Sequence, residues 1–423
     1  MLLTDTYILP KIAQYANPEN TTDSLPSLYG DLTQGSAFGV IHAPCIDTVN
    51  FWYGLSAFPI TDTAPSVYID DVLVTNYTFY SSTNLEDHGL IAAIQFTEKP
   101  TGSVTFRAIG KMPPLAGSRA MRRPFLPHGH ITYRPPAPPG GDGSDNPIAI
   151  LEDILTVMGY TGLRDDASFV RAKAIAETLG LHVAGAITSD QPLIFWIKQL
   201  LASFLGDVWL NADKELVVSL DTIATTIGPI RGFLNQKFYD SPSVHRSVEN
   251  LCNTPVVSYA PNYSGVDRRT TTNTTKNDFD GYDDGTTVQD AISVQQFGVC
   301  QKSFEWYWIR DSTVMRSIQT RIVQLFANPI WIFTVTELQP NNFFVGRGDL
   351  VVASNPLLRD AAQQPIFHQI WKVLEIDKPL MALTPQFVLQ DTGYTYSSPP
   401  IYYNGMVHIG DYTGRHADTE EFY

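Results

Sequence analysis

The sequence contains only three cysteines, Cys45, Cys252 and Cys300, and none of them belongs to a CxxC pair. An odd number of widely spaced cysteines argues against a disulfide framework and against a zinc knuckle. We therefore expect three free thiols in the protein interior.

Basic residues are also scarce, because 28 Lys and Arg against 43 Asp and Glu give a net charge of -15. Binding to nucleic-acid phosphates depends on neutralisation by Lys and Arg, so this charge argues against a general nucleic-acid-binding protein. An acidic surface would instead let DNA pass without adhering to it.

No apolar run is long enough to cross a bilayer: the longest, from Pro192 to Leu205, contains Lys198 and is too short. The first residues lack the basic start, apolar run and cleavage site of a secretory signal. We expect a soluble protein that is synthesised in a cytoplasm and is not stably inserted in a membrane.

Catalytic signatures are missing as well. The sequence has no GxSxG, GxxxxGK[ST] or HExxH, and residues 346–348 lack the third glycine of a dinucleotide loop. We therefore predict no catalytic, cofactor-binding or metal-binding residues, and a protein that is not an enzyme. His128 and His130 could bind a metal only with a third ligand from elsewhere. The Asp-rich segment 278–284 is either a Ca²⁺ site or a plain hydrated turn.

Aromatic residues and turn formers are abundant: aromatics reach 12%, and there are 29 Gly and 29 Pro. This composition favours a mainly β protein of the α+β class over an all-helical one. Short runs rich in β-branched and aromatic residues predict strands of one N-terminal sheet or barrel, at 66–70, 77–80, 90–96 and 103–107.

Helix signals gather in the middle of the chain. Asn146 as N-cap, followed by Pro147 at the first helical position, predicts a helix that begins there and ends at Gly159. Further helices are predicted from about Ala167 to Gly180 with Asp166 as N-cap, from Pro192 to Gly206 after Asp190, and from 312 to 327 with Asp311 as N-cap. The last of these is expected to pack on a sheet made of the strands predicted at 330–336, 350–354, 366–376 and 386–390. Period-two alternation predicts a hairpin over 208–220.

These signals divide the chain into five parts. They are an N-terminal β domain (1–135), a Pro/Gly linker (136–146), a helical subdomain (147–206), a second β region with one long helix (207–393) and a Tyr-rich acidic tail (394–423). Within the second β region, residues 261–290 are polar and are expected to form a mobile surface loop. Arg347, Gly348 and Asp349 stand between two apolar runs and predict a tight turn.

One basic stretch interrupts the acidic chain. Residues 99–141 contain seven Lys and Arg and no Asp or Glu. Arg119, Arg122 and Arg123 are its densest part and predict a docking face for an acidic protein surface or for passing nucleic acid. Ordinary solvated arginines are the alternative.

Four segments carry a resemblance to a known family. They are Leu-Pro-Ser-Leu-Tyr-Gly-Asp at 25–31, Ala-Pro-Cys-Ile-Asp at 43–47, the helix start at 146–156, and Gly-Asp-Leu-Val at 348–351 after a helix that ends in Ala-Asn-Pro. The chain resembles the baseplate and tail-tip hub proteins of tailed bacteriophages.

The resemblance implies a structural virion protein that is synthesised in the host cytoplasm and lies at the distal end of the tail. It implies a homotrimeric ring in which each chain carries two domains similar to the tail-tube β-barrel, as barrels or as sheets, with the helical subdomain between them. The implied partners are a distal tail or tube protein ring, a central fibre or tip protein, the terminus of the tape-measure protein, and DNA in transit.

Such a hub would connect a six-fold tube to a three-fold tip, because two tube-like domains in each of three chains give six modules. We expect an acidic channel that repels DNA phosphates and an Arg119–Arg123 patch that faces another tail protein. A distal tail ring or a tip-fibre base is the closest alternative. A carbohydrate-active enzyme with carboxylates distant in sequence is a further one.

Overall fold

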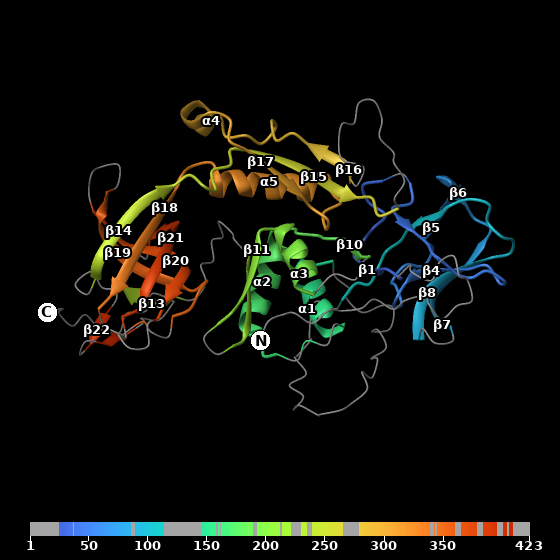
Figure 1. The fold of residues 1–423 in the computed structure, drawn as a ribbon, viewed down its shortest axis with the longest axis horizontal. Helices are drawn as coiled ribbons and strands as arrows, with labels where there is room; N and C mark the ends of the chain where they lie inside the picture. The colour runs from blue at the N-terminus through green and yellow to red at the C-terminus, as the bar shows by residue number, and fades with distance from the viewer. Residues whose placement is uncertain are drawn as a thin grey trace.

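The structure is a computed structural model. It describes residues 25–36, 38–85, 89–113, 145–157, 160, 162–188, 193–211, 214–220, 230–234, 239–264, 279–338, 342, 345–359, 365–378, 384–395, 401–403 and 406–408. The described elements are arranged along one long axis (Figure 1). N-terminal sheets lie at one end, a six-stranded sheet lies at the other, and helices lie between them.

The N-terminal β region consists of two four-stranded sheets, with strand orders β2-β9-β5-β6 and β3-β4-β8-β7. Their strands are β2 (Ile41–His42), β3 (Cys45–Asp47), β4 (Trp52–Ser56), β5 (Ser66–Ile69), β6 (Val72–Val74), β7 (Tyr77–Leu85), β8 (Gly89–Phe96) and β9 (Val104–Arg107). All four strands predicted here from the sequence are confirmed. The expectation of one sheet is wrong, because β5 pairs with β9 whereas β7 pairs with β8.

The helical block contains α1 (Pro147–Val157), α2 (Asp166–Thr178) and α3 (Leu193–Ala202). Asn146 caps α1 as predicted, since its side-chain oxygen accepts from the backbone N–H of Ile148 at 2.9 Å. The cap of α2 is Asp165 and not Asp166, because the Asp165 carboxylate accepts from the first turn and Asp166 is already helical.

A short strand, β10 (Gly185–Ile187), lies within the helical block and pairs antiparallel with β1 (Ser27–Tyr29). Sequence analysis did not predict it. The chain then enters the predicted hairpin, β11 (Gly206–Leu210) and β12 (Leu216–Leu220), whose antiparallel pairing is confirmed.

A three-stranded sheet of order β16-β15-β17 covers the helical block together with α5 (Figure 1). Its elements and neighbours are β15 (Thr254–Pro261), β16 (Phe279–Asp283), α4 (Ala291–Phe297), β17 (Gln301–Glu305) and α5 (Ser312–Phe326). Asp311 caps α5 as predicted. Part of the segment 261–290, expected to be one mobile loop, forms strand β16, while 265–278 lie outside the described residues.

The packing of α5 differs from the prediction. Gln319 of α5 donates to the Pro255 carbonyl of β15 at 3.2 Å and to the Asp283 carboxylate of β16 at 3.1 Å. Its apolar face, with Met315 and Ile318, joins the central core. The helix therefore packs on the sheet that precedes it in sequence and not on the sheet that follows.

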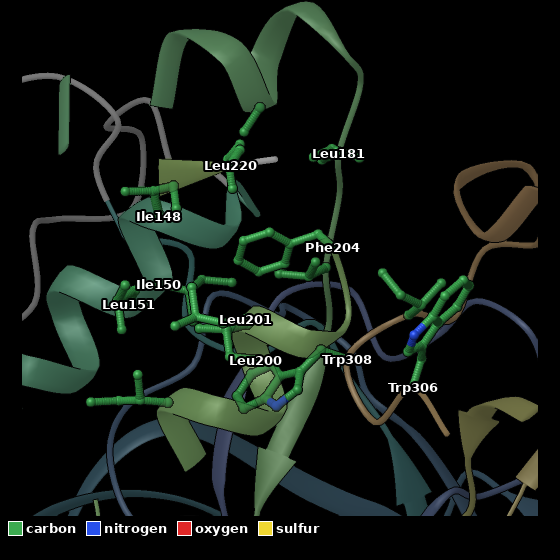
Figure 2. Close-up of a cluster of buried hydrophobic side chains, with 14 of the residues drawn as sticks. Ile148, Ile150, Leu151, Leu181, Leu200, Leu201, Phe204, Leu220, Trp306 and Trp308 are labelled. Atoms are coloured by element: carbon green, nitrogen blue, oxygen red, sulfur yellow. The ribbon is translucent and has the colours of Figure 1, made fainter. Parts of the chain in front are cut away.

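The central core is shared by the helical block, β12, β15 and α5. Trp306 and Trp308 are among its largest fully buried side chains. Figure 2 shows Trp308 near Leu200, Leu201 and Phe204 of the α3 region. Large aromatic side chains that are fully buried contribute strongly to stability, so this cluster holds distant segments of the chain together.

The C-terminal region is a six-stranded sheet of order β13-β19-β20-β21-β18-β14 with its own core around Phe333, Trp371 and Phe387. Its strands are β13 (Ile230–Leu234), β14 (Tyr239–Ser247), β18 (Ile330–Glu337), β19 (Leu350–Arg359), β20 (Pro365–Asp377) and β21 (Gln386–Thr395). Residues 346–349 form the predicted turn, in which the Gly346 N–H donates to the Asp349 carboxylate at 2.8 Å.

The mainly β, α+β class predicted from the sequence is confirmed. In the part of the chain that the structure describes, the sheets are open and none closes into a barrel. The N-terminal and C-terminal β regions have different strand orders. Of the C-terminal tail, the described residues form the small hairpin of β22 (Ile401–Tyr403) and β23 (Met406–His408).

The last residue of β18, Glu337, is a buried carboxyl in the C-terminal sheet. Both of its oxygens accept hydrogen bonds from Asn342, whose side-chain amide lies 2.7 Å away. Asn342 also bonds to both backbone groups of Phe233 in β13. Desolvation raises the pKa of Glu337 from 4.5 to about 7, against the opposing effect of these hydrogen bonds.

The raised pKa predicts a pH-dependent stability. The contribution of Glu337 to the free energy of unfolding is greatest below its unfolded pKa of 4.5. This contribution is lost as the pH rises through the folded pKa of about 7. Glu337→Gln removes the titrating carboxyl. Between about pH 5 and about pH 8, the free energy of unfolding of the wild type should therefore fall by roughly 2 kcal/mol relative to that of the variant. Thermal unfolding of both proteins across this range measures the difference, and parallel curves would contradict it.

Candidate functional site

The predicted docking residues Arg119, Arg122 and Arg123 lie outside the described residues, so the docking face stays a prediction. The same holds for His128 and His130. The basic stretch also contains Arg107 and Lys111, which the structure does describe, and both make contacts within the chain.

Arg107 is held by the loop that precedes β2. Its guanidinium donates to the carbonyls of Thr33, at 3.3 Å, and of Ser36. It also lies over the ring of Tyr68, 5.9 Å from the centroid. These contacts connect the end of β9 to that loop, so the charge of Arg107 is engaged within the chain.

Lys111 forms the centre of a junction between the N-terminal β region and the helical block. Its ammonium lies 2.7 Å from both carboxylate oxygens of Asp153 in α1. The Tyr29 hydroxyl of β1 donates to the same carboxylate at 3.0 Å. Lys111 also lies 5.2 Å from the centre of the Phe58 ring. We call Tyr29, Phe58, Lys111 and Asp153 the α1 junction.

Backbone pairing reinforces the α1 junction. The Lys111 N–H donates to the Leu28 carbonyl at 2.8 Å, and the Gly30 N–H donates to the Lys111 carbonyl at 3.2 Å. On the other side of β1, strand β10 comes so close to the core that a Cβ on Gly185 would lie 2.6 Å from the ring of Trp308. Glycine is therefore required there by contact with a buried indole.

Three of the four segments that carry the family resemblance meet in this region. Tyr29 belongs to the segment 25–31, and its partner Asp153 belongs to the segment 146–156. Leu25 of the first segment packs with Ile46 of the segment 43–47 in one buried cluster. Segments that are up to 124 residues apart thus form one joint between a sheet and a helix.

A second joint is made by Arg310, which is buried just before α5. Its guanidinium donates to the Gln34 carbonyl at 2.9 Å and to the Pro261 carbonyl at 2.8 Å. Desolvation lowers the pKa of Arg310. Gly35 has a φ of +77°, and a Cβ there would lie 2.7 Å from the Arg310 carbonyl oxygen. Arg310 therefore connects the N-terminal region to the end of β15.

In the described part of the Asp-rich segment, Asp283 and Asp284 accept hydrogen bonds from other groups of the chain. Asp283 accepts from the Gly285 N–H at 2.8 Å and from Gln319, and Asp284 accepts from Thr286. Asp278 lies outside the described residues. Among the residues that the structure describes, no group of three or more His, Cys, Asp or Glu is placed to hold a metal ion.

All three cysteines are free thiols, as predicted. Cys252 is buried, whereas Cys45 and Cys300 are only partly buried, so the expectation of three interior thiols holds for Cys252 alone. Burial raises the pKa of the Cys45 and Cys252 thiols, which disfavours the reactive thiolate. Within the described ranges, no helix is long and apolar enough to cross a membrane.

Comparison with known proteins gives similarity only at the level of structure. No protein-family model and no curated protein matches the sequence. The structure is similar to the tail protein from Neisseria meningitidis MC58, with 11% identity and a TM-score of 0.29, over 49% of this chain and 57% of that one.

It is also similar to the 43 kDa tail protein of prophage MuSo2 from Shewanella oneidensis, with 10% identity and a TM-score of 0.28. That alignment covers 49% of this chain and 56% of the Shewanella protein. The chain thus spans little more than half the length of either protein.

The α1 junction predicts a measurable loss of stability when its cation is removed. Lys111→Met leaves the mostly buried Asp153 carboxylate with the Tyr29 hydroxyl but no positive charge. We expect the free energy of unfolding to fall by about 2 kcal/mol, between the values typical of exposed and fully buried pairs. Urea denaturation measures this change.

Lys198→Met is the matched control, because Lys198 is an exposed lysine of α3. The double variant Lys111→Met/Asp153→Leu should lose less than the sum of its single variants, since it leaves no unpaired charge. Equal stabilities of Lys111→Met and Lys198→Met would contradict the role of the junction.

Proposed function

We propose that the chain is a structural protein of a bacteriophage tail, namely the trimeric baseplate hub that adapts the six-fold tail tube to a three-fold tip. The observation that carries the proposal is the α1 junction, where two segments with hub-like sequence, 25–31 and 146–156, meet. A partly buried ion pair, an aromatic contact and strand pairing together make a joint that is suited to a protein under mechanical load. In this proposal the chain has no catalytic role.

The arrangement of the chain supports a symmetry adaptor. Two β regions lie on either side of a helical and aromatic core in each copy (Figure 1). Three copies would therefore present six β regions, which is the number that a six-fold tube requires. With only one β region in each chain, a three-fold ring would offer only three attachment sites to six tube subunits.

The charge of the chain supports a conduit. A net charge of -15 per copy gives a ring that repels DNA phosphates within a Debye length of roughly 8 Å at physiological salt. DNA would then pass without being retained. The proposed partners are the tube or distal tail ring on one side, the tip or fibre protein on the other, and the end of the tape-measure protein in the channel.

The oligomeric state of the purified chain tests this proposal. We expect a mass that corresponds to three copies, measured by mass photometry or by sedimentation. Six copies would favour the distal tail ring over the hub. A stable monomer would contradict both assignments, and cell-wall digestion by that monomer would support the enzyme.

A further inference from the structure

The C-terminal six-stranded sheet has a core of its own. Among the described residues, the buried cluster around Phe333, Trp371 and Phe387 shares no member with the central core that contains Trp306 and Trp308. Figure 1 shows the same separation, because this sheet lies at one end of the long axis and the helices lie nearer its middle. Two bodies with separate cores can move relative to each other unless a large apolar interface joins them. The contacts between the two bodies therefore decide whether the sheet can move.

Two described connections enter the C-terminal sheet side by side. One is 248–253, between β14 and β15, and the other is 327–329, between α5 and β18. On the central side they are joined by the Cys252 N–H, which donates to the Phe326 carbonyl at 2.8 Å. On the sheet side, the ladder between β14 and β18 joins them again where β18 begins. The backbone can therefore bend at the few residues between these two fixed places.

The residues of these connections are suited to bending. Val248, Glu249 and Asn250 are exposed. The Glu249 carbonyl accepts from the Lys302 ammonium at 2.7 Å, and this long side chain can follow a movement of the backbone. In the other connection, Pro329 prevents α5 from continuing as a rigid helix into β18.

The C-terminal sheet also contacts the β11–β12 hairpin. Trp209 of β11 packs so closely against the turn 346–349 that a Cβ on Gly348 would overlap the six-membered ring of the indole. The turn is part of the C-terminal sheet, because the Gly348 N–H donates to the Val373 carbonyl of β20 at 2.7 Å. The hairpin is part of the central body, because β12 contributes to the central core. We call Trp209 and the turn 346–349 the latch.

The two connections and the latch lie at opposite ends of the C-terminal sheet. From β18 through β21 and β20 to β19, each strand is antiparallel to the one before it. Strand β19 therefore runs opposite to β18 and begins at the end of the sheet where β18 stops. The turn 346–349 comes directly before β19, whereas the connections reach the sheet where β18 begins. A rotation about the connections would thus move the turn away from Trp209.

The indole N–H of Trp209 opposes the closed latch. Its nitrogen is buried and has no hydrogen-bond partner among the described residues. A buried donor without a partner costs free energy, and this cost is removed when water reaches the donor. The aromatic contact of the same side chain favours the closed arrangement. The latch therefore combines one interaction that holds it closed with one that favours opening.

We propose that the C-terminal sheet is a hinged body. It rotates about 248–251 and 327–329, and the latch holds it against the β11–β12 hairpin. The inference concerns a movement within one chain, so it goes beyond the proposed function and does not depend on it. In the proposed hub, the rotation would let two β regions with different strand orders meet equivalent tube subunits.

The distance between two spin labels, measured by pulsed electron–electron double resonance, tests the rotation. Val170→Cys on α2 and Gln386→Cys on β21 place the labels at exposed positions of the two bodies. Cys45→Ser and Cys300→Ser remove the two native thiols that are only partly buried. Labelled chains are mixed with an excess of unlabelled chains, so that distances within one copy dominate in any assembly.

Trp209→Ala should open the latch. We expect the ratio of open to closed copies to rise by at least about tenfold, seen as a second population of distances. Trp209→Phe keeps an aromatic ring and lacks the N–H, so it should keep the wild-type distances. Trp52→Ala is the matched control, because Trp52 is a partly buried tryptophan that contacts the Tyr80 ring in the N-terminal sheets. It should also keep the wild-type distances.

Circular dichroism checks the fold of each variant. If Trp209→Ala does not fold, Gly348→Ala replaces it, because its methyl group would push against the indole and should give the same second population. Distances in the latch variant that equal those of Trp52→Ala would overturn the inference. A second population in Trp209→Phe as large as that in Trp209→Ala would overturn it as well. The oligomeric state does not enter these outcomes, so the hub proposal and the hinge can fail separately.

Discussion

The whole arrangement depends on the burial of Trp306 and Trp308 in one apolar core. The two indoles follow β17, yet they pack with side chains of the helical block and of α5, which lie far from each other in sequence. Removing this much aromatic surface from water stabilises this region strongly. The core therefore fixes the positions of the helical block, β15 and α5 relative to one another.

Two of the basic residues that the structure describes, Lys111 and Arg310, lie at joints around this core. Lys111 neutralises Asp153 next to Tyr29, and Arg310 satisfies two carbonyls that belong to distant segments. A protein with a large excess of acidic residues can place some of its basic side chains in such internal contacts and still have an acidic exterior. In the proposed hub, such an exterior would suit a conduit for DNA.

Local structure was largely predictable, because its signals are local. Asn146 and Asp311 were recognised as helix caps, and the hairpin over 208–220 was recognised from its alternation. Strand β10 was missed because three small or apolar residues have no detectable period. Strand β16 was missed because its sequence, Phe-Asp-Gly-Tyr-Asp, is that of a polar turn.

Contacts between distant segments were not predictable from one sequence. Nothing in the pattern indicates that Tyr29 meets Asp153 or that Arg310 reaches Gln34, since neither pair has a period or a spacing. Helix α5 was assigned to the wrong sheet for the same reason: its amphipathic stripe requires an apolar partner but does not say which one.

The most direct measurement of the central claim is a cryo-electron microscopy reconstruction of the assembled chain. We expect three copies around a central hole, with acidic side chains facing the hole. A different number of copies, an assembly without a hole, or a hole lined mainly by Lys and Arg would contradict it.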